Sequence, residues 1–494
     1  MLRALCCVLA ALLIGLGGCR RDEERSATAG QTNESDPAAK VSGDPTPAGT
    51  PSQDESDEPE SSAKNRRKGK PGKKQTGDEP GQTRPDKGRR LADLGYLDFD
   101  EEEVDPEEGH GVVLRDEQRS YPGYNLYNSL PHNLAELIDA DGNVIRSWTY
   151  EPSSRWIRCE LLANGDLLVV GAGGMEEQEG RTRAERGYVM RLSWDGEVLW
   201  QRRMTAHHDI EMTPNDQILV LTQRRRSVPE FDAEKDIRDN RLTLLSPDGS
   251  RLEEHSLYDI FSASGEVFSF QRREREEKEK LRKKREERLK RKQKKAIDLF
   301  HGKAIDLFHA NSVEWMPYPH LQSKGPIYAS SNVIVCSRHQ DTIAIINMEE
   351  KKLVWAWGQG EVSGPHEATF LENGNVLVFD NGFKRNWSRV IEVDPTTNQI
   401  VWEYKADDPE EFHSRARGTA QRLPNGNALV AYSEKGQAFE VTPDGETVWV
   451  FLNPHLGAKG GRATIRMKRY ELSYVRGIME RFGQDEDDKD DGDS

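Results

Sequence analysis

The chain has 494 residues, of which 35% are hydrophobic and 32% are charged, and its formal net charge is −16. This composition is polar for a globular chain, and the acidic balance argues against nucleic-acid binding as the main function. The polar residues are concentrated in a few stretches, and the remaining residues, about 350, are ample for a sizeable core.

The N-terminus has the pattern of a bacterial signal peptide. Arg3 supplies a positive charge, and Leu5–Leu16 forms an apolar stretch that is too short to span a membrane comfortably. The stretch leads through two glycines to Cys19, a sequence that resembles a lipobox. We therefore predict that residues 1–18 are removed and that a lipid on Cys19 anchors an exported protein in the bacterial cell envelope, either in the periplasm or at the outer membrane. An ordinary cleaved signal peptide with an incidental cysteine is the alternative.

Residues 19–95 have the composition of a disordered tether. They consist mainly of Ser, Gly, Pro and charged residues, with almost no aromatic or branched apolar side chains. Such a segment cannot bury enough apolar surface to offset the entropy lost on ordering. We expect a flexible connection between the anchor and a folded domain.

Only two cysteines, Cys159 and Cys336, remain in the part of the chain that can fold. Exported proteins can form disulfides, but these two residues fall in different sequence repeats. The sequence is compatible both with a disulfide and with two separate buried thiols.

A pattern of four short, alternating strands recurs from about residue 123 onward. In the clearest copies, Asn-Gly or Asp-Gly dipeptides separate the first two and the last two strands, and they accept the positive φ that tight hairpins need. Four antiparallel strands repeated at roughly 35–50 residues are typical of propeller blades, whereas a helical solenoid would show a period of about 3.6 residues. Six copies are recognisable, near Ala135, Leu162, Pro214, Asn332, Leu371 and Leu423. We therefore predict an all-β fold, a six-bladed β-propeller over residues 96–475.

Two segments depart from the repeat. Residues 271–295 consist almost entirely of Arg, Lys and Glu, which favours a charged, exposed helix inserted between the third and fourth repeats. Residues 476–494 are expected to form an acidic, disordered tail. Next to the insertion, the sequence Lys-Ala-Ile-Asp-Leu-Phe-His occurs twice, ending at His301 and at His309, and only one copy can occupy the position in the blade.

Three histidines occupy equivalent positions in three repeats. His366 precedes the turn of its repeat by seven residues, and His208 precedes the turn of its own repeat by the same distance. His309 begins the corresponding strand of the fourth repeat. The innermost strands of a propeller line the central channel, so we expect these histidines to converge near the axis at one face. Next to His208 stands His207, and the register alone favours His208.

The same register places a cation beside the histidines. Asn381 follows the turn by as many residues as His366 precedes it, so the hairpin sets these two residues side by side. Alignment of the fourth repeat gives Arg338 the equivalent position beside His309. A guanidinium offers a rigid fork to an oxyanion such as sulfate or phosphate, and a neutral imidazole offers a nucleophile.

Several of these motifs resemble the bacterial aryl sulfate sulfotransferases, six-bladed enzymes that do not use a nucleotide sulfate donor. The resemblance covers about residues 110–475, and it rests on His309-x-Asn311, Ser337-Arg338, Gly-Pro-His366-Glu-Ala-Thr with Asp-Asn381-Gly, and the closing pair Arg469-Tyr470.

The resemblance implies a ping-pong transfer that needs no cofactor and no metal. A sulfohistidine would form when His366 attacks the sulfur of an aryl sulfate, and a phenolic acceptor would then take the sulfuryl group. The sulfonate oxygens would contact His208, His309, Asn311 and Arg338, with His207 and Asn381 as further contacts, and a histidine would protonate the departing phenolate. The expected partners are therefore a small aryl sulfate donor and a phenolic acceptor, together with a membrane that holds the lipid anchor, and not nucleic acid.

Two other functions are compatible with the sequence. A non-catalytic envelope propeller that binds an anionic ligand or scaffolds a complex would keep the fold and Arg338, but it would not require three axial histidines. Three histidines also suit a zinc ion with an open position, although Arg338 beside them disfavours a cation. Quinone-dependent dehydrogenases are propellers too, but the chain lacks a regular tryptophan motif in every repeat.

Overall fold

The computed structural model describes residues 109–130, 132–173, 187–271, 304–457 and 460–483. The predicted signal peptide, Cys19, the tether, His301 and nearly all of the charged insertion lie outside these ranges. Within them, no helix combines the length and the apolar character that crossing a bilayer would need.

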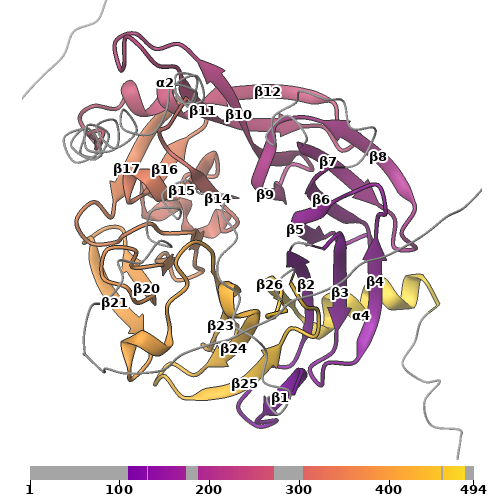
Figure 1. Ribbon diagram of the computed structural model, residues 1–494. Helices are drawn as coiled ribbons and strands as arrows, with labels where there is room; N and C mark the ends of the chain where they lie inside the picture. Colours follow the sequence, from indigo (N-terminus) through magenta and orange to yellow (C-terminus); the bar gives the residue numbers. More distant parts are fainter. Residues whose placement is uncertain (1–108, 131, 174–186, 272–303, 458–459, 484–494) are drawn as a thin grey trace, which may run out of the picture. The chain divides into compact units, whose positions relative to one another are not determined.

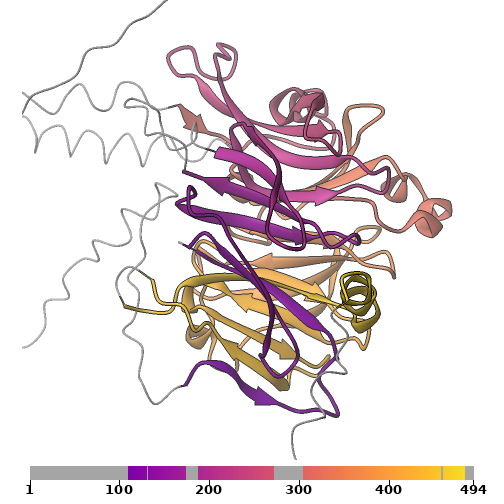
Figure 2. The same ribbon diagram turned by 90° about the vertical axis from the view of Figure 1, so that its right-hand side faces the viewer.

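Six small antiparallel sheets form a ring around a central axis, as Figure 1 shows face-on and Figure 2 from the side. Each sheet has four main strands that follow one another from the axis to the rim. The predicted six-bladed β-propeller is therefore confirmed.

The first three blades, with their strands in order from the axis outward, use the N-terminal half of the ring and the last strand of the chain. Blade 1 contains β26 (Thr464–Tyr470), β2 (Tyr124–Leu130), β3 (Leu134–Ile138) and β4 (Val144–Thr149). Blade 2 contains β5 (Arg155–Leu161), β6 (Leu167–Ala172), β7 (Gly187–Leu192) and β8 (Val198–Arg203). Blade 3 contains β9 (Ala206–Met212), β10 (Ile218–Arg226), β11 (Ile237–Leu245) and β12 (Arg251–Ser256).

The other three blades repeat this order. Blade 4 contains β14 (Ala310–Trp315), β15 (Asn332–Ser337), β16 (Thr342–Asn347) and β17 (Lys352–Trp357). Blade 5 contains β18 (Glu367–Phe370), β19 (Val376–Asp380), β20 (Arg389–Asp394) and β21 (Gln399–Tyr404). Blade 6 contains β22 (Thr419–Arg422), β23 (Ala428–Tyr432), β24 (Gln437–Val441), β25 (Thr447–Leu452) and, at the rim, β1 (Gly111–Arg115).

Shorter elements lie between the blades. The two-residue strand β13 (Ile305–Asp306) pairs with β11, and the helix α2 (Leu257–Ser262) follows β12. Short 3-10 helices are η4 (Pro319–Lys324), η5 (Pro326–Tyr328), η6 (Arg338–Gln340), η7 (Pro409–Glu411) and η8 (Ser433–Lys435).

The burial of a strand follows its place between axis and rim. Every residue of β16 is buried, because Ile343 and Ile345 pack toward blade 5 while Ala344 and Ile346 pack toward blade 3. The outer strand β21 alternates between exposed and partly buried residues. A strand that is buried on both faces, such as β16, therefore has a continuous apolar sequence. A strand with one exposed face, such as β21, has an alternating one.

The Asn-Gly turns act as the sequence predicts. In blade 5, Gly374 takes a φ of 100°, and its amide donates to the carbonyl of Leu371 at 2.9 Å. A residue with a Cβ is strained at this φ, so glycine allows the tight return from β18 to β19.

The two ends of the folded chain close the ring. The last strand, β26, pairs along its whole length with β2, with Tyr124 opposite Tyr470 and Leu130 opposite Thr464. It therefore supplies the innermost strand of the first blade. At the rim, β1 pairs with β25 and adds a fifth strand to the sixth blade.

A buried arginine fixes this seam. The guanidinium of Arg469 donates to Asn125 Oδ1 at 2.7 Å and to the carbonyl of Tyr121 at 2.9 Å, and it pairs with the carboxylate of Glu440 on β24. The side chains of Arg469 and Glu440 are at most 1% exposed. The pair thus joins blade 6 to both chain ends inside the protein.

Replacement of Arg469 by methionine is expected to lower the free energy of unfolding by about 3–5 kcal/mol, because the carboxylate of Glu440 would remain buried without its partner. Denaturation in guanidinium chloride measures the change. The double variant Arg469→Met, Glu440→Gln should regain much of the loss, because it removes the unpaired charge. A double variant as unstable as the single one would contradict this explanation.

The predicted boundary at residue 475 is too early. The helix α4 (Leu472–Arg481) continues the folded part, and Val475, Ile478 and Met479 are buried in a cluster with the side chain of Trp194. The spacing of these apolar residues is helical. The acidic residues that follow dominated the composition of this region and concealed the helix.

Cys159 and Cys336 are both free and buried. Cys159 belongs to the hydrophobic cluster of blades 1 and 2, and Cys336 to that of blades 4 and 5. Of the two alternatives open in the sequence, the structure therefore has the separate thiols. Burial raises the pKa of both thiols, so neither is a ready nucleophile.

Candidate functional site

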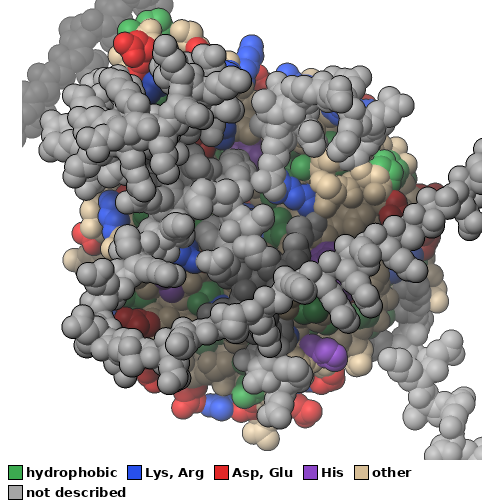
Figure 3. Space-filling view, in the orientation of Figure 1, with side chains coloured by type: hydrophobic (Ala, Val, Ile, Leu, Met, Phe, Trp, Pro, Cys, Tyr) green, Lys and Arg blue, Asp and Glu red, His purple; other side chains and the backbone are tan. Residues whose placement is uncertain are grey.

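The predicted site residues lie at one end of the central channel. His309 and His366 directly precede the innermost strands β14 and β18, and His208 lies near the start of β9. Arg338 and Asn381 directly follow β15 and β19, the second strands of blades 4 and 5. Because neighbouring strands are antiparallel, these starts and ends meet at the same face of the ring. Histidine, lysine and arginine side chains are visible on the face of the molecule drawn in Figure 3.

The contacts of His366 fix its tautomer. His366 Nδ1 lies 2.8 Å from Asn381 Oδ1. The amide nitrogen of Asn381 donates to the carbonyls of Ser414 and Arg417, at 2.6 Å and 2.7 Å, so its oxygen must face the imidazole. An amide oxygen only accepts hydrogen bonds, and His366 Nδ1 therefore carries the proton. The neutral ring then has its lone pair on Nε2, as a nitrogen nucleophile requires.

The surroundings of His366 favour this neutral form. Burial, followed by the charge of Arg338, lowers the pKa of His366 well below its ordinary value. The imidazole is only 3% exposed. At neutral pH the ring is therefore an unprotonated base next to a cation.

Arg338 runs from blade 4 toward blade 5. Its amide donates to the carbonyl of His309 at 3.3 Å, so the backbones of these two residues lie side by side. Its side chain passes Gly364, where a Cβ would lie 3.8 Å from Arg338 Cγ, and its guanidinium carbon lies 5.9 Å from the ring centre of Phe383. Its Nη2 donates to the carbonyl of Arg415 at 3.4 Å. The arginine is buried, so its charge acts in a medium of low dielectric constant.

His207 and His208 occupy different places. His207 Nε2 lies 3.2 Å from the carbonyl of Thr222 and must donate to it, which leaves Nδ1 of the same ring as an acceptor. The two Nδ1 atoms are 2.8 Å apart, so His208 donates to His207. The ring of His208 in turn meets the ring of His309, with centroids 4.9 Å apart. His208 thus lies beside His309, whereas His207 is bonded to the backbone of β10.

Both histidines of this pair are held neutral. Burial lowers the pKa of His207 to about 4 and the pKa of His208 well below its ordinary value. In the neutral tautomer described above, His208 Nε2 accepts hydrogen bonds. A neutral His208 in this tautomer therefore does not suit the predicted contact with sulfonate oxygens, because these oxygens only accept hydrogen bonds.

The backbone is strained at two of the axial histidines. His208 has a φ of 61° and His309 a φ of 47°, both in the left-handed region. The pairing of β9 with β10 is irregular across His208, and the pairing of β14 with β15 is irregular just after His309, between Ala310 and Ser312. Such conformations cost about 1–3 kcal/mol each and persist only where the surroundings hold them. One such support is Arg466 of β26, whose guanidinium donates to the carbonyl of His208 at 2.9 Å.

The segment before His309 is clamped by the last residue of β15 and by the 3-10 helix η6. The hydroxyl of Ser337 donates to the carbonyl of Phe308 at 2.9 Å, and Gln340 Nε2 donates to the carbonyl of Leu307 at 2.8 Å. The ring of His339 donates through Nδ1 to the carbonyl of Asp306 at 2.7 Å. This clamp fixes the chain that carries His309.

His309 has a carboxylate partner that the sequence did not reveal. His309 Nδ1 lies 2.7 Å from Asp306 Oδ2. Burial alone would raise the pKa of Asp306, but His309, His339 and Arg238 outweigh it and hold that pKa well below the usual range. Asp306 is therefore an ionised carboxylate beside His309. The only hint in the sequence is that the duplicated segment repeats the Asp-x-x-His spacing.

The amides predicted to touch substrate hold the site together. Asn381 forms hydrogen bonds with His366, Ser414 and Arg417. Asn311 Nδ2 donates to the carbonyl of Pro365 at 3.1 Å and so joins the start of β14 to the start of β18. Asn311 Oδ1 is buried without a hydrogen-bond partner among the described residues. This oxygen suits a donor such as a hydroxyl group rather than a sulfonate oxygen.

The residues that follow the axial histidines lock neighbouring blades together. Arg158 Nε lies 3.1 Å from Asp209 Oδ1, and its Nη1 lies 3.4 Å from Glu367 Oε1. The same carboxylates accept the backbone amides of Val313 and Ala420, at 3.0 Å and 2.8 Å. The spacing of blades 2, 3, 4, 5 and 6 is thus set by buried charges next to the site.

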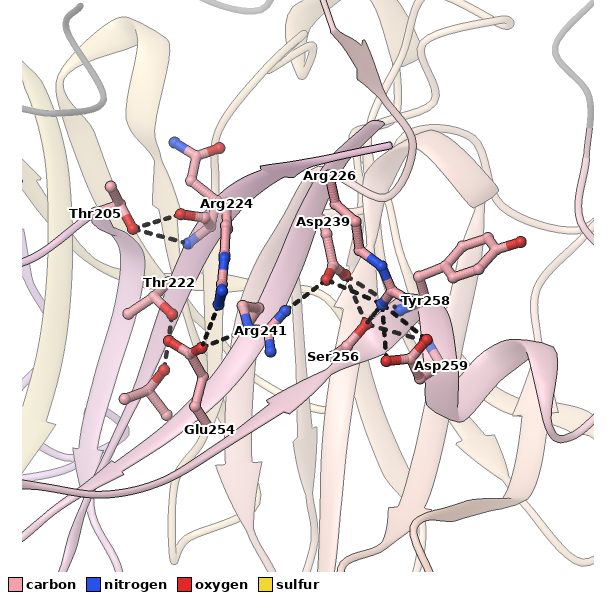
Figure 4. A network of polar contacts seen from close by, with 12 residues as sticks. Thr205, Thr222, Arg224, Arg226, Asp239, Arg241, Glu254, Ser256, Tyr258 and Asp259 are labelled. Carbon is pink, nitrogen blue, oxygen red and sulfur yellow. Dashed lines mark hydrogen bonds and ion pairs between the residues drawn. The ribbon is translucent and has the colours of Figure 1, made fainter. Parts of the chain in front are cut away.

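A polar network supports blade 3 behind His207. It joins the ends of β10, β11 and β12 to α2 through Arg226, Asp239, Arg241, Ser256 and Asp259 (Figure 4). Asp239 is fully buried at its centre. The same view contains Thr222, whose carbonyl receives the hydrogen bond of His207.

One group of side chains could hold a metal ion. The donor atoms of Asp306, His309 and His339 lie within 4.8 Å of one another, and carboxylate with imidazole is a donor set that suits zinc. Among the described residues, these are the donors that converge, rather than the three axial histidines. Nδ1 of each ring is already bonded to an oxygen of Asp306, which favours internal hydrogen bonding over coordination.

No curated protein matches the sequence. Among solved structures, a protein of unknown function from Bacteroides caccae is 14% identical, with 71% of this chain and 100% of the other covered and a TM-score of 0.43. A streptogramin B lyase is 12% identical, with 73% and 93% covered and a TM-score of 0.38. Virginiamycin B lyase from Staphylococcus aureus is 10% identical, with 71% and 86% covered and a TM-score of 0.36. These likenesses are too distant to bear on function.

A family model is more informative. The model described as arylsulfotransferase (ASST) matches residues 158–453, a range that runs from blade 2 to the end of blade 6 and contains every candidate residue at the channel mouth. The chain therefore belongs to the arylsulfotransferase family.

Proposed function

We propose that the protein moves a sulfuryl group from an aryl sulfate to a phenolic acceptor through a covalent intermediate on His366. The observation that carries the proposal is the tautomer of His366, whose Nδ1 proton is bound by Asn381 so that Nε2 presents a lone pair. Membership of the arylsulfotransferase family supports the same class of substrate.

In the first half-reaction, His366 Nε2 attacks the sulfur and the bond from sulfur to the aryl oxygen breaks. The electron pair of that bond leaves with the aryl oxygen as a phenolate. In the second half-reaction, the oxygen of the acceptor phenol attacks the sulfur, the bond from nitrogen to sulfur breaks, and its electron pair returns to His366. Negative charge is spread over three sulfonate oxygens throughout, much as in phosphoryl transfer.

Arg338 is the cation that best suits this charge. It is buried, it is the charged group that most lowers the pKa of His366, and its planar fork can hold two oxygens at once. A fixed guanidinium in a dry site stabilises developing charge without reorganising.

A propeller that only binds an anionic ligand is the second candidate. The buried Arg338 would serve it equally well. Ligand binding alone does not require a fixed tautomer of His366, and for that reason we favour the enzyme.

Intact-protein mass spectrometry after incubation with 4-nitrophenyl sulfate, without an acceptor, tests the proposal. We expect a mass gain of one sulfonate group per chain, together with release of 4-nitrophenol in equal amount. Peptide mapping should place the adduct on His366, and added phenol should remove it. A folded sample that neither gains mass nor releases 4-nitrophenol with several aryl sulfates would favour the binding propeller instead.

A further inference from the structure

The sulfuryl transfer proposed above requires a proton carrier, and the four imidazoles at the channel mouth are not equal candidates. The phenolate formed in the first half-reaction must gain a proton, and the acceptor phenol must lose one in the second. His366 is occupied as the nucleophile. His207 donates to the backbone and is turned away from the site. His208 donates through Nδ1 to His207, which is a neutral ring and not a carboxylate.

His309 has the partner that a proton carrier needs. Its Nδ1 bonds to Asp306 Oδ2 at 2.7 Å, so the carboxylate holds the proton on Nδ1 and fixes the orientation of the ring. An ionised carboxylate also stabilises the imidazolium that forms when Nε2 takes a proton. The ring of His309 meets the ring of His208 on one side and stacks on the ring of His339, with centroids 4.7 Å apart, on the other.

Asp306 is itself held in place. Its backbone is part of β13, which pairs with β11 so that Arg238 stands opposite Asp306. Its carbonyl accepts from His339 Nδ1 at 2.7 Å, and its carboxylate lies 3.4 Å from Arg238 Nη1. The backbone next to His309 is held as well, because the carbonyl of Phe308 accepts a hydrogen bond from Ser337. A rigid carboxylate and a rigid ring give a hydrogen bond with little freedom to rearrange.

We propose that Asp306 is a positioning residue and that His309 is the acid and base of the transfer, a role that rests on the sulfuryl transfer through His366. In the first half-reaction, His309 Nε2–H gives its proton to the departing aryl oxygen as the bond from sulfur to oxygen breaks. In the second, the neutral His309 Nε2 takes the proton of the acceptor hydroxyl as that oxygen attacks the sulfur. His309 ends each cycle in the state in which it began, and Asp306 keeps its charge throughout.

The basicity of the leaving group distinguishes proton transfer by His309 from a purely structural role of Asp306. Phenyl sulfate releases a strongly basic phenolate that needs the proton, whereas 4-nitrophenyl sulfate releases a weakly basic one that can depart without it. For Asp306→Asn, single-turnover release of phenol from phenyl sulfate should slow by about 10²-fold or more, and release from 4-nitrophenyl sulfate by less than about fivefold.

Asp195→Asn is the matched control. This carboxylate lies in the turn between β7 and β8, is 67% exposed and pairs with Arg146. Its replacement also removes one negative charge and should leave both rates unchanged.

A second variant covers the case in which Asp306→Asn does not fold. His309→Asn keeps a residue that tolerates the left-handed backbone, and it should show the same selective loss with phenyl sulfate. The double variant Asp306→Asn, His309→Asn should be no slower than His309→Asn alone, because both changes remove one function. Equal losses for the two donors, or losses that multiply in the double variant, would overturn the assignment. If the unaltered protein releases neither phenol, it is the sulfuryl transfer itself that fails.

Discussion

His366→Asn is expected to lower kcat/KM for 4-nitrophenyl sulfate by at least about a thousandfold, because it removes the lone pair that attacks sulfur and leaves the rest of the channel mouth intact. Asparagine is smaller than histidine but polar, so the buried oxygen of Asn381 keeps a donor within the same pocket. Initial rates with a phenol acceptor measure the loss. The variant should also fail to gain a sulfonate group when the acceptor is omitted.

His255→Gln is the matched control for a lost imidazole. His255 lies on the rim strand β12, where it contacts Glu253 at 2.7 Å, and its replacement should leave the rate unchanged. Equal thermal midpoints for both variants would show that folding is not the cause of the difference. If His366→Asn kept a tenth of the activity, the nucleophile would have to be sought elsewhere.

Arg338→Lys is expected to lower kcat/KM by about a hundredfold although the charge is kept, because an ammonium group cannot hold two sulfonate oxygens in a plane. Arg338→Gln should lower it further, because the charge is lost as well. Initial rates over a range of donor concentrations measure both changes. Similar rates for Arg338→Lys and the unaltered protein would mean that the fork is not used.

The two arginine variants should also differ in pH dependence. His366 attacks only when neutral, so activity falls as the pH drops through the pKa of its imidazole. Arg338 is one of the causes that lower this pKa, after burial, and its removal raises it. The acid limb of the pH profile should therefore move to higher pH in Arg338→Gln and stay near its original place in Arg338→Lys. A shift of the same size in both would assign the effect to something other than charge.

The sequence allowed the six blades and most of the channel mouth to be predicted, because a repeat carries its own register. Once the Asn-Gly turns are aligned, equal distances before and after the turn identify residues at the same height in different blades. This is how His366 could be set beside Asn381, and His309 beside Arg338, before any coordinates were known. In the structure, the ring of His366 is hydrogen-bonded to the side-chain amide of Asn381, and the backbone amide of Arg338 donates to the carbonyl of His309.

Other features follow from contacts that a repeat does not encode. The irregular start of β9 breaks the simple count, and only the hydrogen bond to Thr222 shows that His207 faces away from the site. Asp306 lies in the two-residue strand β13, which precedes β14 and has no counterpart in the described part of the other blades. Its contact with His309 depends on a local fold of the chain, which is held by Ser337 at the end of β15 and by His339 in η6.

The seam between β26 and β2 also bears on the order in which the protein folds. Blades 2–6 each draw their four main strands from one continuous stretch of chain, so their hairpins close over short loops. Blade 1 has to wait for a strand from the opposite end of the chain, which makes it the step with the highest contact order. Until β26 has paired with it, β2 presents an open edge that is able to pair with other chains. A nearly complete, unclosed ring is therefore the folding intermediate that is most exposed to aggregation.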